Sequence, residues 1–118
     1  MNYTDQYAYG YRYLDNVFAG SLQPRNTSQT QQTGVSYRRV AMSKANVEWA
    51  ASLGLEAELQ TFEIWTITLA AGYVPGVGDV WTDKDGGLPW NVIKVDADPL
   101  VTSTGMPARY FLVGQRAK

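Results

Sequence analysis

The chain has 118 residues, a formal net charge of −1, and neither Cys nor His. This length suits one domain with a modest core. The missing residue types exclude disulfides, thiolate zinc sites, cysteine nucleophiles and the Ser-His-Asp triad, and no basic surplus favours nucleic-acid binding. No apolar run approaches the roughly 18 residues that span a bilayer, and the N-terminus lacks the pattern of a signal peptide, so no membrane partner is expected.

Two unusual segments occupy the first third of the chain. Tyrosines alternate with other residues at Tyr7, Tyr9, Tyr11 and Tyr13. This period of two favours an extended segment, either an edge strand that covers the core or an arm that docks on a neighbouring subunit. Leu14–Gly20 predicts a short helical turn or a loop. Ser21–Gly34 is rich in Gln, Thr, Ser and Asn, which predicts a long loop or a disordered segment.

From residue 35 onward the pattern is that of a compact β unit. Val35–Met42 predicts a strand. Lys44–Ala51 is interpreted as a strand because Val47 and Trp49 alternate with polar residues, with a helix over 43–53 as the alternative, since Ala and Glu favour helices. Thr61–Leu69 is rich in β-branched and aromatic residues with two largely apolar faces, which predicts a central strand buried on both sides.

The rest of the chain predicts a hairpin and one last strand. After a loop over Ala71–Gly78, two β-rich runs at 80–82 and 90–95 flank the turn residues Asp83–Gly87. Asp98–Pro107 predicts a connector, Ala108–Gly114 the last strand and residues 115–118 a polar tail. Trp49, Trp65 and Trp81 fall on three different predicted strands. We therefore predict an all-β fold, a small antiparallel β-barrel or sandwich of five to seven strands, with an N-terminal arm and loop over residues 1–34 and the barrel domain over 35–118.

The residues that could form metal-binding, phosphate-binding or catalytic motifs do not have the spacing that these motifs require. Asp79, Asp83, Asp85 and Gly86 suggest a calcium loop, but Lys94 stands where an EF-hand places its bidentate Glu. The glycines around Pro75 form neither the G-x-G-x-x-G nor the G-K-[ST] phosphate-binding signature. The three acidic residues Glu56, Glu58 and Glu63 show no sign of a paired arrangement across a cleft. No enzyme activity, metal or cofactor is expected. Exposed Trp and Tyr rings that stack on sugars would make a carbohydrate-binding module, which stays an alternative.

Arginine outnumbers lysine six to four. Because Arg forms bidentate pairs with carboxylates across interfaces, Arg side chains are candidates for contacts between subunits. The candidate interface residues are the four tyrosines above together with Arg25, Arg38, Arg39 and Arg109. Arg12 and Arg116 extend the same basic strip.

Residues 35–118 resemble the head–tail joining and head-closure proteins of tailed bacteriophages. The matching stretches are Ile64–Ile67, the P-x-x-G-D motif of Pro75–Val80, the turn Asp83–Gly87, Trp90–Val95 and Arg109–Val113. In that family a final strand closes the barrel. The N-terminal third has no counterpart in the family pattern, which leaves a tail-terminator or other neck role open.

The resemblance implies a non-enzymatic protein of the virion neck, assembled in the host cytoplasm. It implies a homo-oligomeric ring, sixfold or twelvefold, between the portal or adaptor and the tail. DNA would pass through the ring without specific binding, which a near-neutral chain permits. Ser21–Gly34 and Asp98–Pro107 are the segments expected to contact partners or gate the channel.

Overall fold

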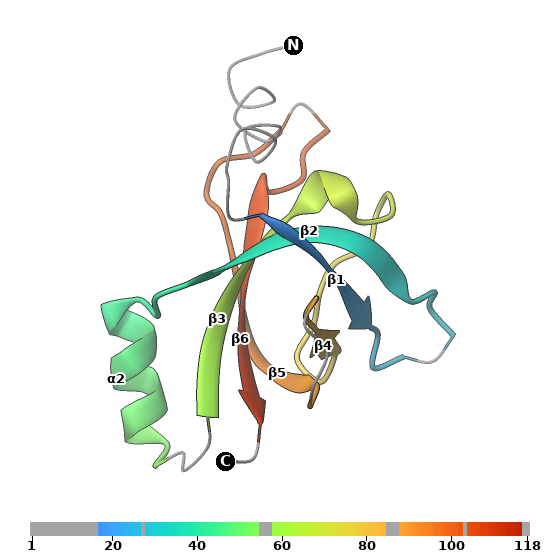
Figure 1. Cartoon of the computed structure of the whole chain (residues 1–118). Coiled ribbons are helices and arrows are strands. Elements are labelled where there is room, and N and C mark those ends of the chain that lie inside the picture. Colours follow the sequence, from blue (N-terminus) through green and yellow to red (C-terminus); the bar gives the residue numbers. More distant parts are fainter. Residues whose placement is uncertain (1–16, 27, 55–57, 85–87, 103, 117–118) are drawn as a thin grey trace.

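A computed structural model describes residues 17–26, 28–54, 58–84, 88–102 and 104–116. These residues form a closed antiparallel barrel with the strand order β1-β2-β3-β6-β5-β4 (Figure 1). The strands are β1 (Phe18–Gln23), β2 (Gln32–Val40), β3 (Glu58–Trp65), β4 (Val80–Thr82), β5 (Trp90–Ala97) and β6 (Arg109–Arg116), and the helices are α2 (Lys44–Ser52) and the 3₁₀ turn η2 (Thr66–Thr68). The prediction of a small antiparallel β-barrel is confirmed.

The expected hairpin is present and forms part of the barrel wall. β4 pairs with β5 in the register Val80↔Asn91 and Trp81↔Trp90. β5 then pairs with β6, and β6 with β3, so the last strand lies inside the wall. β1 pairs with β2 on one side and with β4 on the other, which completes the ring of strands.

The expectation of a long loop over Ser21–Gly34 is wrong. Its first residues belong to β1 and its last to β2, and the connection between the strands covers only residues 24–31. Leu22 is fully buried, and the buried Gln32 side chain accepts a hydrogen bond from Ala70 N at 2.8 Å. Pro24 is buried as well, while Arg25, Asn26 and residues 28–31 are exposed, so a few buried side chains are enough to fix this polar segment. The expected boundary between residues 34 and 35 therefore falls inside β2.

Strand β1 also corrects the prediction for Leu14–Gly20. Phe18, Ala19 and Gly20 are extended and pair with β2, where a helical turn or a loop was expected. Residues 14–16 lie outside the described part of the chain, as do the tyrosines at 7, 9, 11 and 13.

The strand predicted over Lys44–Ala51 is a helix, as the alternative held. Ser43 is its N-cap, and its Oγ accepts a hydrogen bond from Asn46 N at 3.2 Å. The buried residues Asn46 and Ala50 are four positions apart, which is one helical turn. The alternation of Val47 and Trp49 was misleading, and Trp49 lies on α2 rather than on a strand. A serine cap followed by alanines decides the conformation here.

Strand β3 is central and buried on both faces, as predicted, although its bounds differ. It begins at Glu58 and ends at Trp65, and all five residues from Thr61 to Trp65 are buried. Thr66–Thr68 leave the strand as η2. There the Thr68 hydroxyl donates to Trp65 O at 2.7 Å and accepts from Ser36 N at 3.0 Å. This local side-chain bonding explains why the β-rich sequence stops being a strand at Thr66.

The remaining elements agree with the sequence. The predicted strand over Val35–Met42 is β2, the loop over 71–78 contains no strand, and residues 98–107 form a connector held by an isolated bridge between Val101 and Pro107. The last strand runs to Arg116, so Gln115 and Arg116 are part of β6 rather than of a polar tail. No helix within the described residues is long and apolar enough to cross a membrane.

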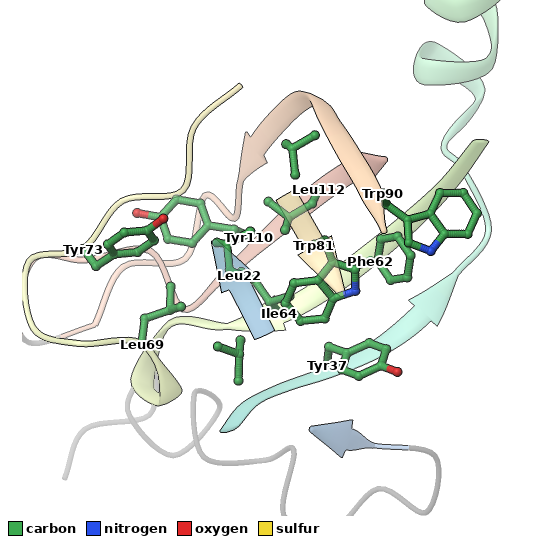
Figure 2. Packing of buried hydrophobic residues seen from close by; sticks show 12 residues of the cluster. Leu22, Tyr37, Phe62, Ile64, Leu69, Tyr73, Trp81, Trp90, Tyr110 and Leu112 are labelled. Atoms are coloured by element: carbon green, nitrogen blue, oxygen red, sulfur yellow. The ribbon is translucent and has the colours of Figure 1, made fainter. Parts of the chain in front are cut away.

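Aromatic rings fill the interior of the barrel. The Tyr37 ring meets the Trp81 ring edge-on at 4.9 Å, and Phe62 meets Trp90 at 5.4 Å (Figure 2). Smaller apolar side chains, among them Leu22 and Leu112, complete the cluster. Edge-to-face packing adds stabilisation beyond the buried area.

We expect Gly20→Ala to destabilise the fold because β1 approaches the Trp81 ring closely. A Cβ at position 20 would lie 2.5 Å from Trp81 Cζ2 and 2.9 Å from the backbone oxygen of Thr82. Overpacking of this kind costs about 1–3 kcal/mol, measurable as the free energy of unfolding in urea. Gly76→Ala is the matched control, since a Cβ there meets nothing within 4 Å and its φ is not positive. Equal stabilities for the two variants would contradict the packing.

Candidate interaction surface

A buried carboxylate on the outer face of β3 organises one side of the barrel. Glu63 lies between the core residues Phe62 and Ile64, so its side chain points away from the core. Only 1% of its side chain is exposed. Arg38 Nε on β2 donates to Glu63 Oε2 at 2.6 Å, and Arg109 on β6 donates to Oε1. One carboxylate therefore joins three adjacent strands.

Arg109 extends this cluster to the connector after β5. Its Nε donates to Asp98 Oδ2 at 2.8 Å, and Asp98 is itself buried. Arg109 also lies over the Phe111 ring, and Arg38 over the Trp65 ring, at 5.2 and 5.9 Å. Two arginines and two carboxylates thus neutralise one another in one chain of contacts. Because their guanidinium groups bind these internal carboxylates, the structure assigns both arginines a role in the fold, and an interface role for either remains a prediction.

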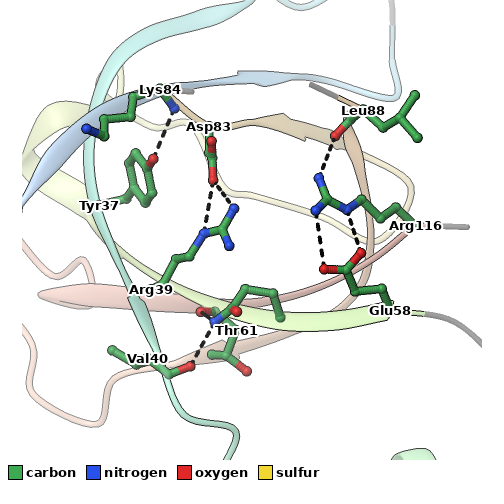
Figure 3. A network of polar contacts seen from close by, with 10 residues as sticks. Tyr37, Arg39, Val40, Glu58, Thr61, Asp83, Lys84, Leu88 and Arg116 are labelled. Carbon is green, nitrogen blue, oxygen red and sulfur yellow. Dashed lines mark hydrogen bonds and ion pairs between the residues drawn. The ribbon is translucent and has the colours of Figure 1, made fainter. Parts of the chain in front are cut away.

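A second charged cluster covers the end of the barrel where β3 begins and β6 ends (Figure 3). Arg39 Nε donates to the buried Asp83 at 3.0 Å, and its guanidinium lies 5.6 Å from the Trp90 ring. Arg116 lies 4.1 Å from the same ring and donates to Glu58 at 3.0 Å. The Arg39 side chain is 45% exposed, so this candidate residue faces solvent while it holds its carboxylate.

The P-x-x-G-D motif is a structural turn built around Asp79. The buried Asp79 carboxylate accepts hydrogen bonds from Tyr73 Oη at 3.0 Å, Gly76 N at 2.9 Å and Arg25 N at 2.9 Å. The segment between Tyr73 and Asp79 is therefore fixed to the end of β1. We call residues 73–79 the Asp79 loop.

The Asp79 loop presents apolar side chains to solvent. Val74 and Val77 are each 58% exposed. The fourth described candidate, Arg25, lies beside them: a Cβ at Gly78 would come 2.6 Å from Arg25 Cδ, so the arginine side chain crosses this glycine. Arg25 is exposed, and no ion pair involves its guanidinium among the described residues. Valines flanking a P-G pair were the sequence signal for this surface, which the sequence reasoning did not use.

Helix α2 presents a second exposed surface. Asn46 fastens the helix to β5, where its amide donates to Asp96 Oδ2 at 3.0 Å and accepts from Lys94 Nζ. The opposite face of the helix carries Val47, 52% exposed, together with the exposed Glu48 and Ala51. In Figure 1, α2 stands on one side of the barrel and the β1–β2 turn on the other.

The geometry offers no centre for metal or sugar binding. Among the described residues, no group of three acidic side chains is placed to hold a metal ion, and Asp79 and Asp83 are bonded within the chain. Three of the four tryptophans, Trp65, Trp81 and Trp90, are at most 3% exposed and cannot offer a face to a sugar.

Comparisons with known proteins add no relative: no family model matches the chain, and neither the curated proteins nor the solved structures give a significant match.

Glu63→Gln is expected to destabilise the fold strongly, because the amide removes the charge that both Arg38 and Arg109 face. Breaking a buried pair from one side costs about 3–5 kcal/mol. Glu58→Gln is the matched control: the Glu58–Arg116 pair is solvent-exposed, and such pairs contribute about 0–1 kcal/mol. Urea unfolding of both variants measures the difference. A loss for Glu63→Gln no larger than for Glu58→Gln would refute the assignment.

Stability is expected to fall as the pH rises above 10. Burial, reinforced by the hydrogen bond to Asp79 and by its charge, raises the pKa of Tyr73 above its ordinary value of 10.0, and burial raises the pKa of Tyr110 as well. The unfolded chain then loses these protons while the folded chain keeps them, which favours unfolding. Tyr73→Phe removes one contribution, so its unfolding free energy should decline less steeply as the pH rises above about 10. Parallel slopes for the two proteins would contradict this.

Proposed function

We propose that this chain is a structural protein of the neck of a tailed-bacteriophage virion. It forms a ring between the portal or adaptor and the tail, completes the DNA-filled head and joins it to the tail. It is assembled in the host cytoplasm and acts without enzymatic chemistry, cofactor or membrane. DNA passes through the ring without specific contacts.

The observation that carries the proposal is the placement of the motif that resembles the joining proteins. Pro75–Val80 forms the Asp79 loop and the start of β4, Trp90–Val95 forms most of β5, and Arg109–Val113 forms β6. These stretches are neighbours in the barrel wall, because β4 pairs with β5 and β5 with β6. The motif is thus used as framework rather than as a binding loop, which suits a rigid assembly unit.

The disposition of charge also supports an assembly role. The four buried carboxylates of the described chain, on Glu63, Asp79, Asp83 and Asp98, each accept hydrogen bonds from the chain itself. Catalytic acids and bases instead need an available proton site facing a substrate. The exposed apolar side chains include Val74 and Val77 on a fixed loop and Val47 on a helix, which suit contacts between proteins.

Deleting the gene from the phage or prophage that carries it tests the proposal. We expect negative-stain electron microscopy to show DNA-filled heads and free tails in place of complete particles, and expression of the wild-type chain in trans to restore them. A cheaper observation is the gene neighbourhood, which should hold portal, capsid and tail genes. Normal numbers of tailed particles from the deletion mutant would exclude the neck role.

A further inference from the structure

We propose that copies of this chain associate head to tail, with the exposed face of α2 of one copy docked on the Asp79 loop of the next. The inference rests on the proposed ring and identifies its contact. The α2 face comprises Val47, Glu48 and Ala51, and the loop face comprises Val74, Val77 and Arg25. The α2 face of one copy binds the loop face of a second copy.

Apolar area is the first feature that the two faces share. On the loop, Val74 and Val77 are both more than half exposed. On the helix, Val47 is more than half exposed, and Ala51 lies one turn further on the same side. Burying such side chains against one another is the main favourable contribution to protein association.

Charge complementarity identifies the partner as a second copy. Arg25 is the cation beside the two loop valines, and Glu48 is the anion beside Val47. Neither side chain has an ion-pair partner among the described residues. Lys44 lies one turn before Glu48, and no ion pair joins them in the described chain. A contact that brings Val47 to Val77 can therefore bring Glu48 to Arg25, so each face offers what the other lacks.

Hydrogen bonds within the chain hold both faces in place, so docking costs little conformational entropy. The Asp79 carboxylate fixes the loop through Tyr73, Gly76 and the Arg25 backbone. Asn46 holds α2 through Asp96 and Lys94. Preorganised surfaces lose less conformational entropy when they bind.

The positions of the faces determine the kind of assembly. Both faces border β5: α2 is bonded to Lys94 and Asp96, and the Asp79 loop is bonded to Val92. A contact between two different faces of identical chains leaves one face of each type free at the ends, so it can repeat, and it forms a ring when the rotation between neighbours closes. A twofold dimer would instead make the same contact twice, reciprocally, and stop at two copies.

The test combines two single variants, Val47→Glu and Val77→Glu, measured by sedimentation velocity and light scattering over a concentration series. Each should weaken self-association at least about tenfold by placing a charge in an apolar contact. Each variant keeps one intact face. An equimolar mixture should therefore form a one-to-one dimer and nothing larger. Far-UV circular dichroism and thermal unfolding check that both variants are folded.

Charge-reversal variants provide an independent test of the same contact. Arg25→Glu and Glu48→Arg should each weaken assembly, and mixing the two should restore it, because every contact then again joins opposite charges. Assembly of unchanged size in both glutamate variants, a mixture that grows beyond the dimer, or no recovery in the charge-swapped mixture would overturn the inference. So would a wild-type chain that remains monomeric at every concentration. The gene deletion tests the neck role separately. If these variants disprove the contact between α2 and the Asp79 loop, the proposed neck role is not affected.

Discussion

Strand β3 can occupy the centre of the barrel wall only because Glu63 is neutralised on its outer face. Phe62 and Ile64 point into the core, and the alternation of a strand then places Glu63 on the other side. Burying one carboxylate costs several kcal/mol unless it is paired and hydrogen-bonded. Arg38 and Arg109 supply both, one from each neighbouring strand. The same contacts therefore offset the cost of the charge and hold the order β2-β3-β6.

The sequence predicts the barrel because its strong strands carry their signal locally. β3, β5 and β6 are dense in β-branched and aromatic residues, and the β4–β5 hairpin contains its own turn residues. β1 has no such signal. Its place depends on Leu22 entering a core that other strands build, and on Gly20 allowing the Trp81 ring to approach. Such long-range packing cannot be read from the composition of residues 21–34.

The candidate residues were chosen by type, and the structure separates them by environment. Arg38 and Arg109 are engaged with a buried carboxylate, Arg39 caps one end of the barrel, and Arg25 alone has a guanidinium without an ion pair among the four described candidates. Single-sequence reasoning could not distinguish these cases, because the partners Glu63, Asp83 and Asp98 lie 11 to 46 positions away in the chain. The exposed valines of the Asp79 loop were missed because a P-G turn was interpreted only as a connection.

Closure of the barrel limits how copies of this chain can assemble. Each of the six strands pairs with two neighbours, so none of the described strands is an edge strand open along one whole side. Side chains that project from the wall, the helix and the loops are therefore the main surface for association. Among the described residues, the most exposed valines lie on α2 and on the Asp79 loop, the two places where rigid elements extend beyond the strands. A ring built from these contacts would leave every barrel intact, and its strength would depend on a few valines and one pair of opposite charges.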